Sequence, residues 1–110
     1  MYLPIELVIL NPEVEKHGLP TWATIGSAGM DLRALETVEM HSGDSHAFPL
    51  GFAIALPFGV CGLLAPRSGL GIKQIHLSNL VGIIDSDYQG EIVVNLTNNS
   101  RHPVPFEIKK

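Results

Sequence analysis

Short runs of apolar and β-branched residues, each ended by proline, glycine or asparagine, recur along this chain. The first run, residues 5–10, ends at Asn11-Pro12 and is typical of a strand followed by a turn. The same pattern predicts further strands at residues 27–34, 60–65, 72–77, 81–84, 91–96 and 104–108. It also predicts strand structure within residues 38–49, interrupted by a turn at 41–44, and within the overlapping run 47–56, interrupted at Gly51. Residues 12–26, with Trp22 as their one large anchor, are expected to be mostly loop, and no window shows a helical stripe.

Eight or nine short strands at spacings of roughly 8 to 12 residues are typical of a sandwich or barrel and not of alternating βα units. Eleven glycines and eight prolines supply enough turn residues for such a chain. The predicted fold class is therefore all-β, a jelly-roll-like β-sandwich or barrel. No repeat, linker or low-complexity segment divides the sequence, so residues 1–110 are expected to form a single domain.

Composition excludes two classes of partner. The net charge is −4, and the seven Lys and Arg residues are scattered except for Lys109-Lys110, which argues against binding a nucleic acid polymer. The longest uncharged stretch, residues 47–66, is interrupted by prolines and glycines, which argues against a membrane helix. At 110 residues with 45% apolar content, the chain has a core but would gain stability from oligomerisation.

The single cysteine, Cys61, cannot form an internal disulfide, and the N-terminus lacks the shape of a signal peptide. We therefore expect a protein of a reducing compartment, the cytoplasm. Cys61 stands in an apolar strand and is expected to be a small buried hydrophobe. The five histidines show no metal-ligand spacing among themselves or with Cys61.

Residues 79–92 place two carboxylates, Asp85 and Asp87, and the aromatic Tyr88 between two apolar strands. Asp85 directly follows the apolar run 81–84, so partial removal from water would make it a better proton acceptor and a candidate general base. The alternative is that Asp85 or Asp87 only forms an Asx-turn. Tyr88 would either stack on a sugar or base, or cover the edge of the core.

A second loop, residues 66–71, offers chemistry suited to an anion. Arg67 can form charge-assisted hydrogen bonds to phosphate oxygens, Ser68 adds a neutral donor, and Gly69 permits close approach to its own N–H. The alternative is a surface turn with a solvated arginine. Further upstream, Asp31 would suit a hydrated Mg²⁺, although a plain ion pair with Arg33 explains its position equally well.

Three segments in this order, residues 27–34, 66–71 and 79–92, resemble the first three sequence motifs of the homotrimeric dUTP diphosphatases (dUTPases), in particular the bacterial and phage members. The resemblance extends over nearly the whole chain, including residues 19–21 and 49–51. It implies a jelly-roll subunit in a homotrimer with active sites at the subunit interfaces. It also implies Mg²⁺-dependent hydrolysis of dUTP to dUMP and pyrophosphate.

The resemblance assigns a role to each matching residue. Asp85 would deprotonate the water that attacks the α-phosphorus, Tyr88 would pack under the deoxyribose and exclude a 2′-hydroxyl, and Asp31 would bind the hydration shell of Mg²⁺. The residues expected to recognise uracil are Asn79 and, through their backbone groups, Ile83, Ile84 and the Ile92-Val93 strand. The residues expected to hold the phosphates are Arg67, Ser68 and Gly69.

The chain departs from the family in several places. The fourth motif and the glycine-rich C-terminal arm with their strands have no counterpart, so we expect the 110 residues alone to be weak or inactive. Gln74 stands where many relatives have glycine, and Leu50 where threonine is common. The alternatives are a non-catalytic binding or regulatory subunit of the same fold, and the related dCTP deaminases. The deaminases are disfavoured because no second arginine or catalytic glutamate follows residue 66 at the expected place.

Overall fold

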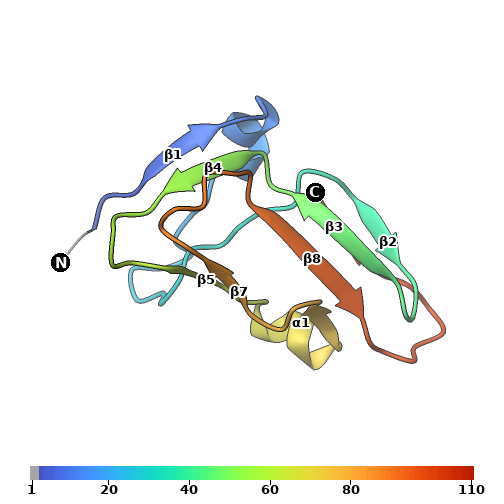
Figure 1. The fold of residues 1–110 in the computed structure, drawn as a ribbon. Coiled ribbons are helices and arrows are strands. Elements are labelled where there is room, and N and C mark those ends of the chain that lie inside the picture. The colour runs from blue at the N-terminus through green and yellow to red at the C-terminus, as the bar shows by residue number, and fades with distance from the viewer. Residues whose placement is uncertain (1–2) are drawn as a thin grey trace.

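The computed structural model describes residues 3–110, which form nine short strands and two single-turn helices (Figure 1). The strands are β1 (Glu6–Ile9), β2 (Val38–Met40), β3 (Ser45–Pro49), β4 (Phe52–Ala55), β5 (Gly62–Leu64), β6 (Ile75–Leu77), β7 (Gly82–Ile84), β8 (Val93–Asn98) and β9 (Phe106–Ile108). The helices are η1, a π-helical turn (Val14–Gly18), and α1 (Ser68–Ile72). The predicted all-β class is confirmed.

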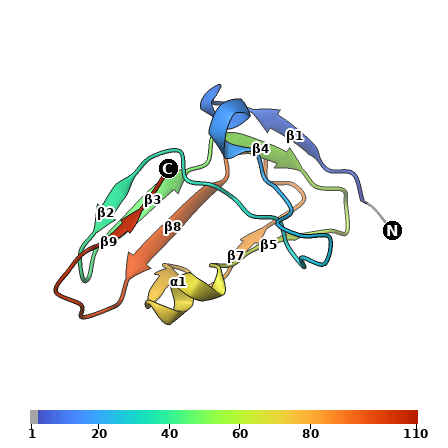
Figure 2. The same cartoon turned by 180° about the vertical axis from the view of Figure 1, so that it is seen from behind.

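Four small antiparallel sheets make up the fold. Their strand orders are β1-β4, β2-β9, β3-β8-β6 and β5-β7. Most pairs join segments distant in sequence, and Figure 2 shows β9 returning to lie beside β2. Because β2 pairs with β9 while β3 pairs with β8, the turn between β2 and β3 does not close a simple hairpin.

The core follows the period-two alternation of the strands. In β8, Val94, Leu96 and Asn98 point inward, while Val93 and Asn95 are exposed. The buried apolar side chains come from η1, from strands of three sheets, and from the segments that follow β3 and precede β8: Val14, Met40, Phe48, Leu50, Phe52, Ile75, Leu77, Ile92 and Leu96. These side chains fix which face of β8 turns outward, and its first residue, Val93, reaches the candidate site.

An apolar groove of about 830 Å³ lies between the sheets, and Met30, Leu63 and Leu70 are among the residues that line it. The chain exposes 7645 Å² at a mass of 11.9 kDa, whereas a compact monomer of that mass exposes ~6,000 Å². The chain therefore leaves uncovered a surface that most monomers bury. That residues 1–110 form a single domain stays a prediction.

Three local predictions were wrong. Residues 27–34 do not form a strand, because their only ladder contact is an isolated bridge between Asp31 and Thr21. Cys61 is exposed and not buried, since it precedes β5 at an open end of the β5-β7 ribbon. The two helices lie where loop or strand was expected. No helix in residues 3–110 is both long and apolar enough to cross a membrane.

Candidate active site

A pocket of about 190 Å³ lies between β7, the turn that follows it and the start of β8. We call it the turn pocket, and its lining residues are Leu64, Asn79, Gly82, Ile83, Ile84, Asp85, Tyr88, Glu91, Ile92 and Val93. It is smaller than the roughly 300–1,000 Å³ typical of complete ligand sites. The structure thus brings together seven of the residues predicted to contact substrate or perform catalysis, in a pocket smaller than a complete ligand site.

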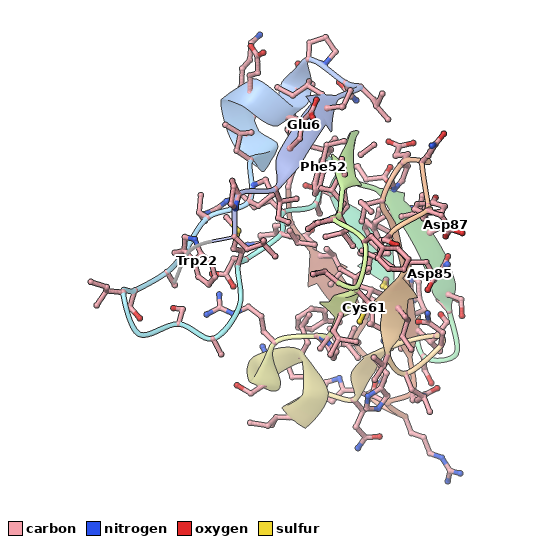
Figure 3. All side chains as sticks on the ribbon, turned by 60° about the vertical axis from the view of Figure 1, so that its left-hand side comes forward. Glu6, Trp22, Phe52, Cys61, Asp85 and Asp87 are labelled. Atoms are coloured by element: carbon pink, nitrogen blue, oxygen red, sulfur yellow. The ribbon has the colours of Figure 1, made fainter. Side chains whose placement is uncertain are left out.

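In the turn after β7, the Asp85 carboxylate is not used to close the turn. The Tyr88 N–H donates to the Asp85 backbone carbonyl at 3.1 Å, so the backbone itself closes the turn. Within residues 3–110 neither the Asp85 nor the Asp87 side chain accepts a hydrogen bond, so an Asx-turn does not explain them. Asp85 is exposed in the single chain, which means that the expected partial burial is not provided by its own subunit (Figure 3).

Tyr88 is held in place from two sides. Its hydroxyl donates to the Glu91 backbone carbonyl at 2.7 Å. Its ring lies directly over Gly90, where an added Cβ would be only 2.6 Å from the Tyr88 hydroxyl oxygen. The ring therefore forms one wall of the turn pocket in a defined orientation, while 46% of the residue remains exposed.

The remaining predicted residues form a second group, which we call the Arg67 cluster: Asp31, Arg67, Ser68 and Gly69. Arg67 Nε lies 3.6 Å from Asp31 Oδ1, with 75% of the arginine side chain exposed. Arg67 caps α1 in an extended conformation, which leaves the first N–H groups of the helix without intrahelical partners. Nothing lies within 4 Å of where a Gly69 Cβ would be, so a ligand could approach this backbone.

The two groups lie at opposite ends of the β5-β7 ribbon. Ile84 pairs with Gly62, and Asp85 leaves the ribbon from that end. Gly82 pairs with Leu64, and the chain runs from that other end to Arg67. This arrangement is compatible with a site that takes Asp85 and Arg67 from different copies of the chain.

The Arg67 cluster can be tested for its fit to Mg²⁺. This ion keeps several of its waters and is usually held by one or two carboxylates together with substrate phosphates. Asp31 supplies one half-buried carboxylate beside a phosphate-binding type of residue, and such a donor set suits contact with the hydration shell. In residues 3–110 no three His, Cys, Asp or Glu side chains gather into a protein-only metal cage.

Sequence reasoning gave no role to three of the lining residues: Leu64, Gly82 and Glu91. Leu64 and Gly82 are cross-strand partners in the β5-β7 ribbon, a pairing of distant segments that the local pattern did not indicate. Glu91 lies within residues 79–92, the stretch that contains the predicted base Asp85. Its position directly after Gly90, opposite the turn, was the available signal.

Comparison with known proteins identifies the family. The dUTPase family model matches residues 15–110. A deoxyuridine 5′-triphosphate nucleotidohydrolase of Shewanella sp. (strain MR-7) is 48% identical over 98% of this chain and 74% of that protein. The corresponding protein of Shewanella oneidensis is 47% identical over the same shares. The chain belongs to the dUTPase family.

Solved structures of phage dUTPases share its fold. The dUTPase of phage phi11 of S. aureus, in a structure describing a structural Mg(II) ion, superimposes with a TM-score of 0.77 at 26% identity. It covers 89% of this chain, which spans 61% of that protein. A Staphylococcus bacteriophage 80alpha dUTPase with dUpNHpp gives a TM-score of 0.78 at 25% identity, over 91% of this chain and 57% of that one. The dUTPase-type fold expected from the sequence is thereby confirmed.

Proposed function

We propose that this chain takes part in the hydrolysis of dUTP to dUMP and pyrophosphate, with the turn pocket as the deoxyuridine half of the site. The observation that carries this proposal is that Asn79, Asp85 and Tyr88 line one pocket in a chain of the dUTPase family. The Shewanella relatives bear the same activity in their names. The cytoplasm, or the host cytoplasm for a phage protein, stays the predicted location.

In this mechanism the Asp85 carboxylate takes a proton from a water molecule. The water oxygen forms a bond to the α-phosphorus, and the bond between that phosphorus and the bridging oxygen breaks, releasing pyrophosphate. Asp85 is suited to this role because its carboxylate has no competing hydrogen bond within residues 3–110. Asp85 is exposed now, so a second copy packed over it would supply the shielding that strengthens its electrostatic interactions.

The other lining residues determine what is bound. The Asn79 amide offers both a donor and an acceptor to the edge of uracil, and the backbone of Ile83, Ile84 and Val93 offers further groups. A base that leaves one of these groups unpaired is disfavoured by ~1–3 kcal/mol. The Tyr88 ring packs under the sugar, where a 2′-hydroxyl would collide with it.

The Arg67 cluster supplies the phosphate half of the site. The Arg67 guanidinium and the donors of Ser68 and Gly69 suit the phosphates, and the Asp31 carboxylate suits the waters around Mg²⁺. When bound, Mg²⁺ would neutralise charge that develops on the phosphate oxygens. Since this cluster and Asp85 lie at opposite ends of the β5-β7 ribbon, each site takes Asp85 from one copy and Arg67 from another.

We propose a homotrimer as the assembly that does this. The chain exposes roughly 1,600 Å² more than a compact monomer of its mass would, about twice the ~800 Å² that one partner buries in a standard interface and so enough for the two contacts that each subunit makes in a trimer. Part of it is an apolar patch beside the turn pocket, which we call the ribbon patch: Leu63, Leu80, Val81 and Ile83. Leu63 and Ile83 are cross-strand partners and are 69% and 66% exposed. A patch of this kind favours contact between copies at the edge of the site.

The first experiment measures pyrophosphate release from dUTP with Mg²⁺ under single-turnover conditions, for the wild-type chain and for Asp85→Asn. The conservative change keeps the size of the side chain and removes the base, so we expect a loss of at least ~100-fold. Equal rates for both variants would exclude Asp85 from the chemistry. Binding of dUTP with no turnover would favour a non-catalytic binding subunit.

A second experiment tests the shared site directly. Asp85→Asn and Arg67→Ala chains are unfolded, mixed in equal amounts and refolded. If a site takes Asp85 from one subunit and Arg67 from another, random assembly leaves roughly a quarter of the sites with both native residues. We therefore expect the mixture to recover about a quarter of the wild-type rate. A mixture as inactive as its components would show that both residues must come from one chain.

A further inference from the structure

Glu91 connects the turn pocket to a rigid point in the core. Its Oε2 accepts a hydrogen bond from the Gly51 N–H at 2.9 Å, and the contact is partly buried. The adjacent Ile92 is bonded on both sides to the turn between β3 and β4, since its N–H donates to the Phe52 carbonyl and its carbonyl accepts from the Leu50 N–H. The segment that leads from the pocket into β8 is therefore attached to this turn at three points.

Backbone geometry, packing and hydrogen bonds all constrain the turn at Gly51. Gly51 has a φ of 78°, a left-handed conformation that side chains other than glycine rarely adopt. An added Cβ would lie 2.7 Å from Val14 Cγ2 and 2.8 Å from Leu35 Cδ1, so the backbone is in tight contact with the core. The Gly51 carbonyl also accepts hydrogen bonds from the N–H groups of Leu10 and Asn11. Both polar backbone groups of Gly51 are thus occupied.

The other end of Glu91 holds Tyr88. The backbone carbonyl of Glu91 accepts the Tyr88 hydroxyl, and the same ring rests on Gly90. The Tyr88 N–H in turn closes the turn that carries Asp85. Glu91 thus links the tightly packed Gly51 turn to the aromatic wall of the pocket, through its side chain on one side and its backbone carbonyl on the other.

We propose that Glu91 is a positioning residue, whose carboxylate fixes the orientation of the Tyr88 ring and thereby the discrimination between deoxyribose and ribose. It acts through Tyr88 and does not itself touch the reacting atoms. The part of this inference that concerns sugar discrimination rests on the proposed function. The effect on the ring, however, can be measured in the absence of any nucleotide.

The test uses the full 110-residue chain labelled with 3-fluorotyrosine, in a Tyr2→Phe background so that Tyr88 gives the only tyrosine signal. We expect Glu91→Ala to shift the ¹⁹F resonance of Tyr88 towards its position in unfolded protein. Glu91→Gln keeps an oxygen acceptor for the Gly51 N–H and should retain the native resonance. Glu107→Ala, a change at an exposed glutamate of β9, is the matched control and should leave the signal unchanged.

The second readout is the ratio of affinities for dUMP and UMP, measured by calorimetry. Glu91→Ala removes the hydrogen bond from the Gly51 N–H to the Glu91 carboxylate, and with it the fixed orientation of the Tyr88 ring. We expect the ratio to fall about tenfold, the size of effect that loss of one hydrogen bond to a charged group has. Glu91→Gln should restore the ratio. Gly90→Ala reaches the same ring by a different route, because the new methyl group would displace the Tyr88 hydroxyl. It should shift the resonance and lower the ratio as well.

Two results would overturn the proposal. If Glu91→Ala lowers the melting temperature but leaves both the Tyr88 resonance and the affinity ratio as in the wild type, then Glu91 only stabilises the fold. If Glu91→Gln behaves like Glu91→Ala, the hydrogen-bond acceptor is not what matters. A wild-type chain that binds neither nucleotide would contradict the proposed function, and the ¹⁹F comparison would still decide the role of Glu91.

Discussion

Asn98 is a polar residue buried in the core at the end of β8, with 1% of its surface exposed, and it provides a quantitative test of the fold. Its Nδ2 donates to the Met40 carbonyl at 2.9 Å and so joins β8 to β2. Its Oδ1 accepts from the N–H and the hydroxyl of Ser100, at 2.9 and 2.7 Å. Both ends of the amide are therefore used, as burial of such a group requires.

Replacing Asn98 with alanine affects these partners unequally. Met40 is 1% exposed, so its carbonyl would lose its side-chain donor far from water, at a cost of ~1–3 kcal/mol. Ser100 is only half-buried and can bond to water, so its two lost contacts should cost about 1 kcal/mol or less. The free energy of unfolding should fall by about 1–4 kcal/mol. For a chain of this size that loss lowers Tm by roughly 4–16 °C.

Urea unfolding followed by far-UV circular dichroism measures this loss. Asn98→Asp keeps the acceptor for Ser100 but removes the donor to Met40, so it should retain most of the destabilisation. Asn99→Ala, at the exposed neighbouring position, should change stability by less than about 0.5 kcal/mol. If Asn98→Ala and Asn99→Ala had similar effects, the buried amide would not be what joins these strands and the reasoning would be refuted.

Two further predictions concern backbone strain and assembly. Gln74 has a φ of 62°, a conformation that glycine adopts more easily, so Gln74→Gly should raise the free energy of unfolding by about 0.5–1 kcal/mol. Lys73 has an ordinary φ of −85°, so Lys73→Gly should lower the free energy of unfolding, and urea titration of both variants measures the two opposite changes. Leu63→Glu places a charge in the ribbon patch and should convert the assembly to monomers in sedimentation velocity, whereas Val104→Glu, at a similarly exposed apolar residue, should not. Equal sedimentation of the two variants would exclude the ribbon patch as an interface.

Most strands could be predicted because their signals are local. The run at residues 5–10 contains β1, the run at 60–65 contains β5, and the break at Gly51 is a real turn between β3 and β4. In residues 5–10 and on both sides of Gly51, β-branched or aromatic residues coincide with an apolar pattern and with a turn residue at the end, while residues 60–65 are predicted by their continuous apolar run alone. Where propensity and pattern agree, the structure follows them.

Where they disagree, alternation alone was misleading. Residues 27–34 alternate between small or polar and apolar side chains, but they contain no β-branched or aromatic residue, and only Asp31 forms a bridge. The Gln74 backbone shows why glycine would suit that position, a constraint that no periodicity reveals. The helices η1 and α1 are five residues long, which is too short for a 3.6-residue period to be visible.

The candidate site divides along the same line between local and distant information. The turn pocket is built mainly from residues 79–93, one continuous stretch that contains Asn79, Asp85 and Tyr88, so these residues could be grouped from the sequence. Pairing Asp31 with Arg67 requires the tertiary fold, and the sequence could not reveal it. Any contact between Arg67 and Asp85 is still harder to predict from the sequence, because the register of β5 and β7 places the two residues beyond opposite ends of the ribbon. A second copy is the simplest means of reuniting them, which is why subunit mixing, more than any single substitution, tests how this site is built.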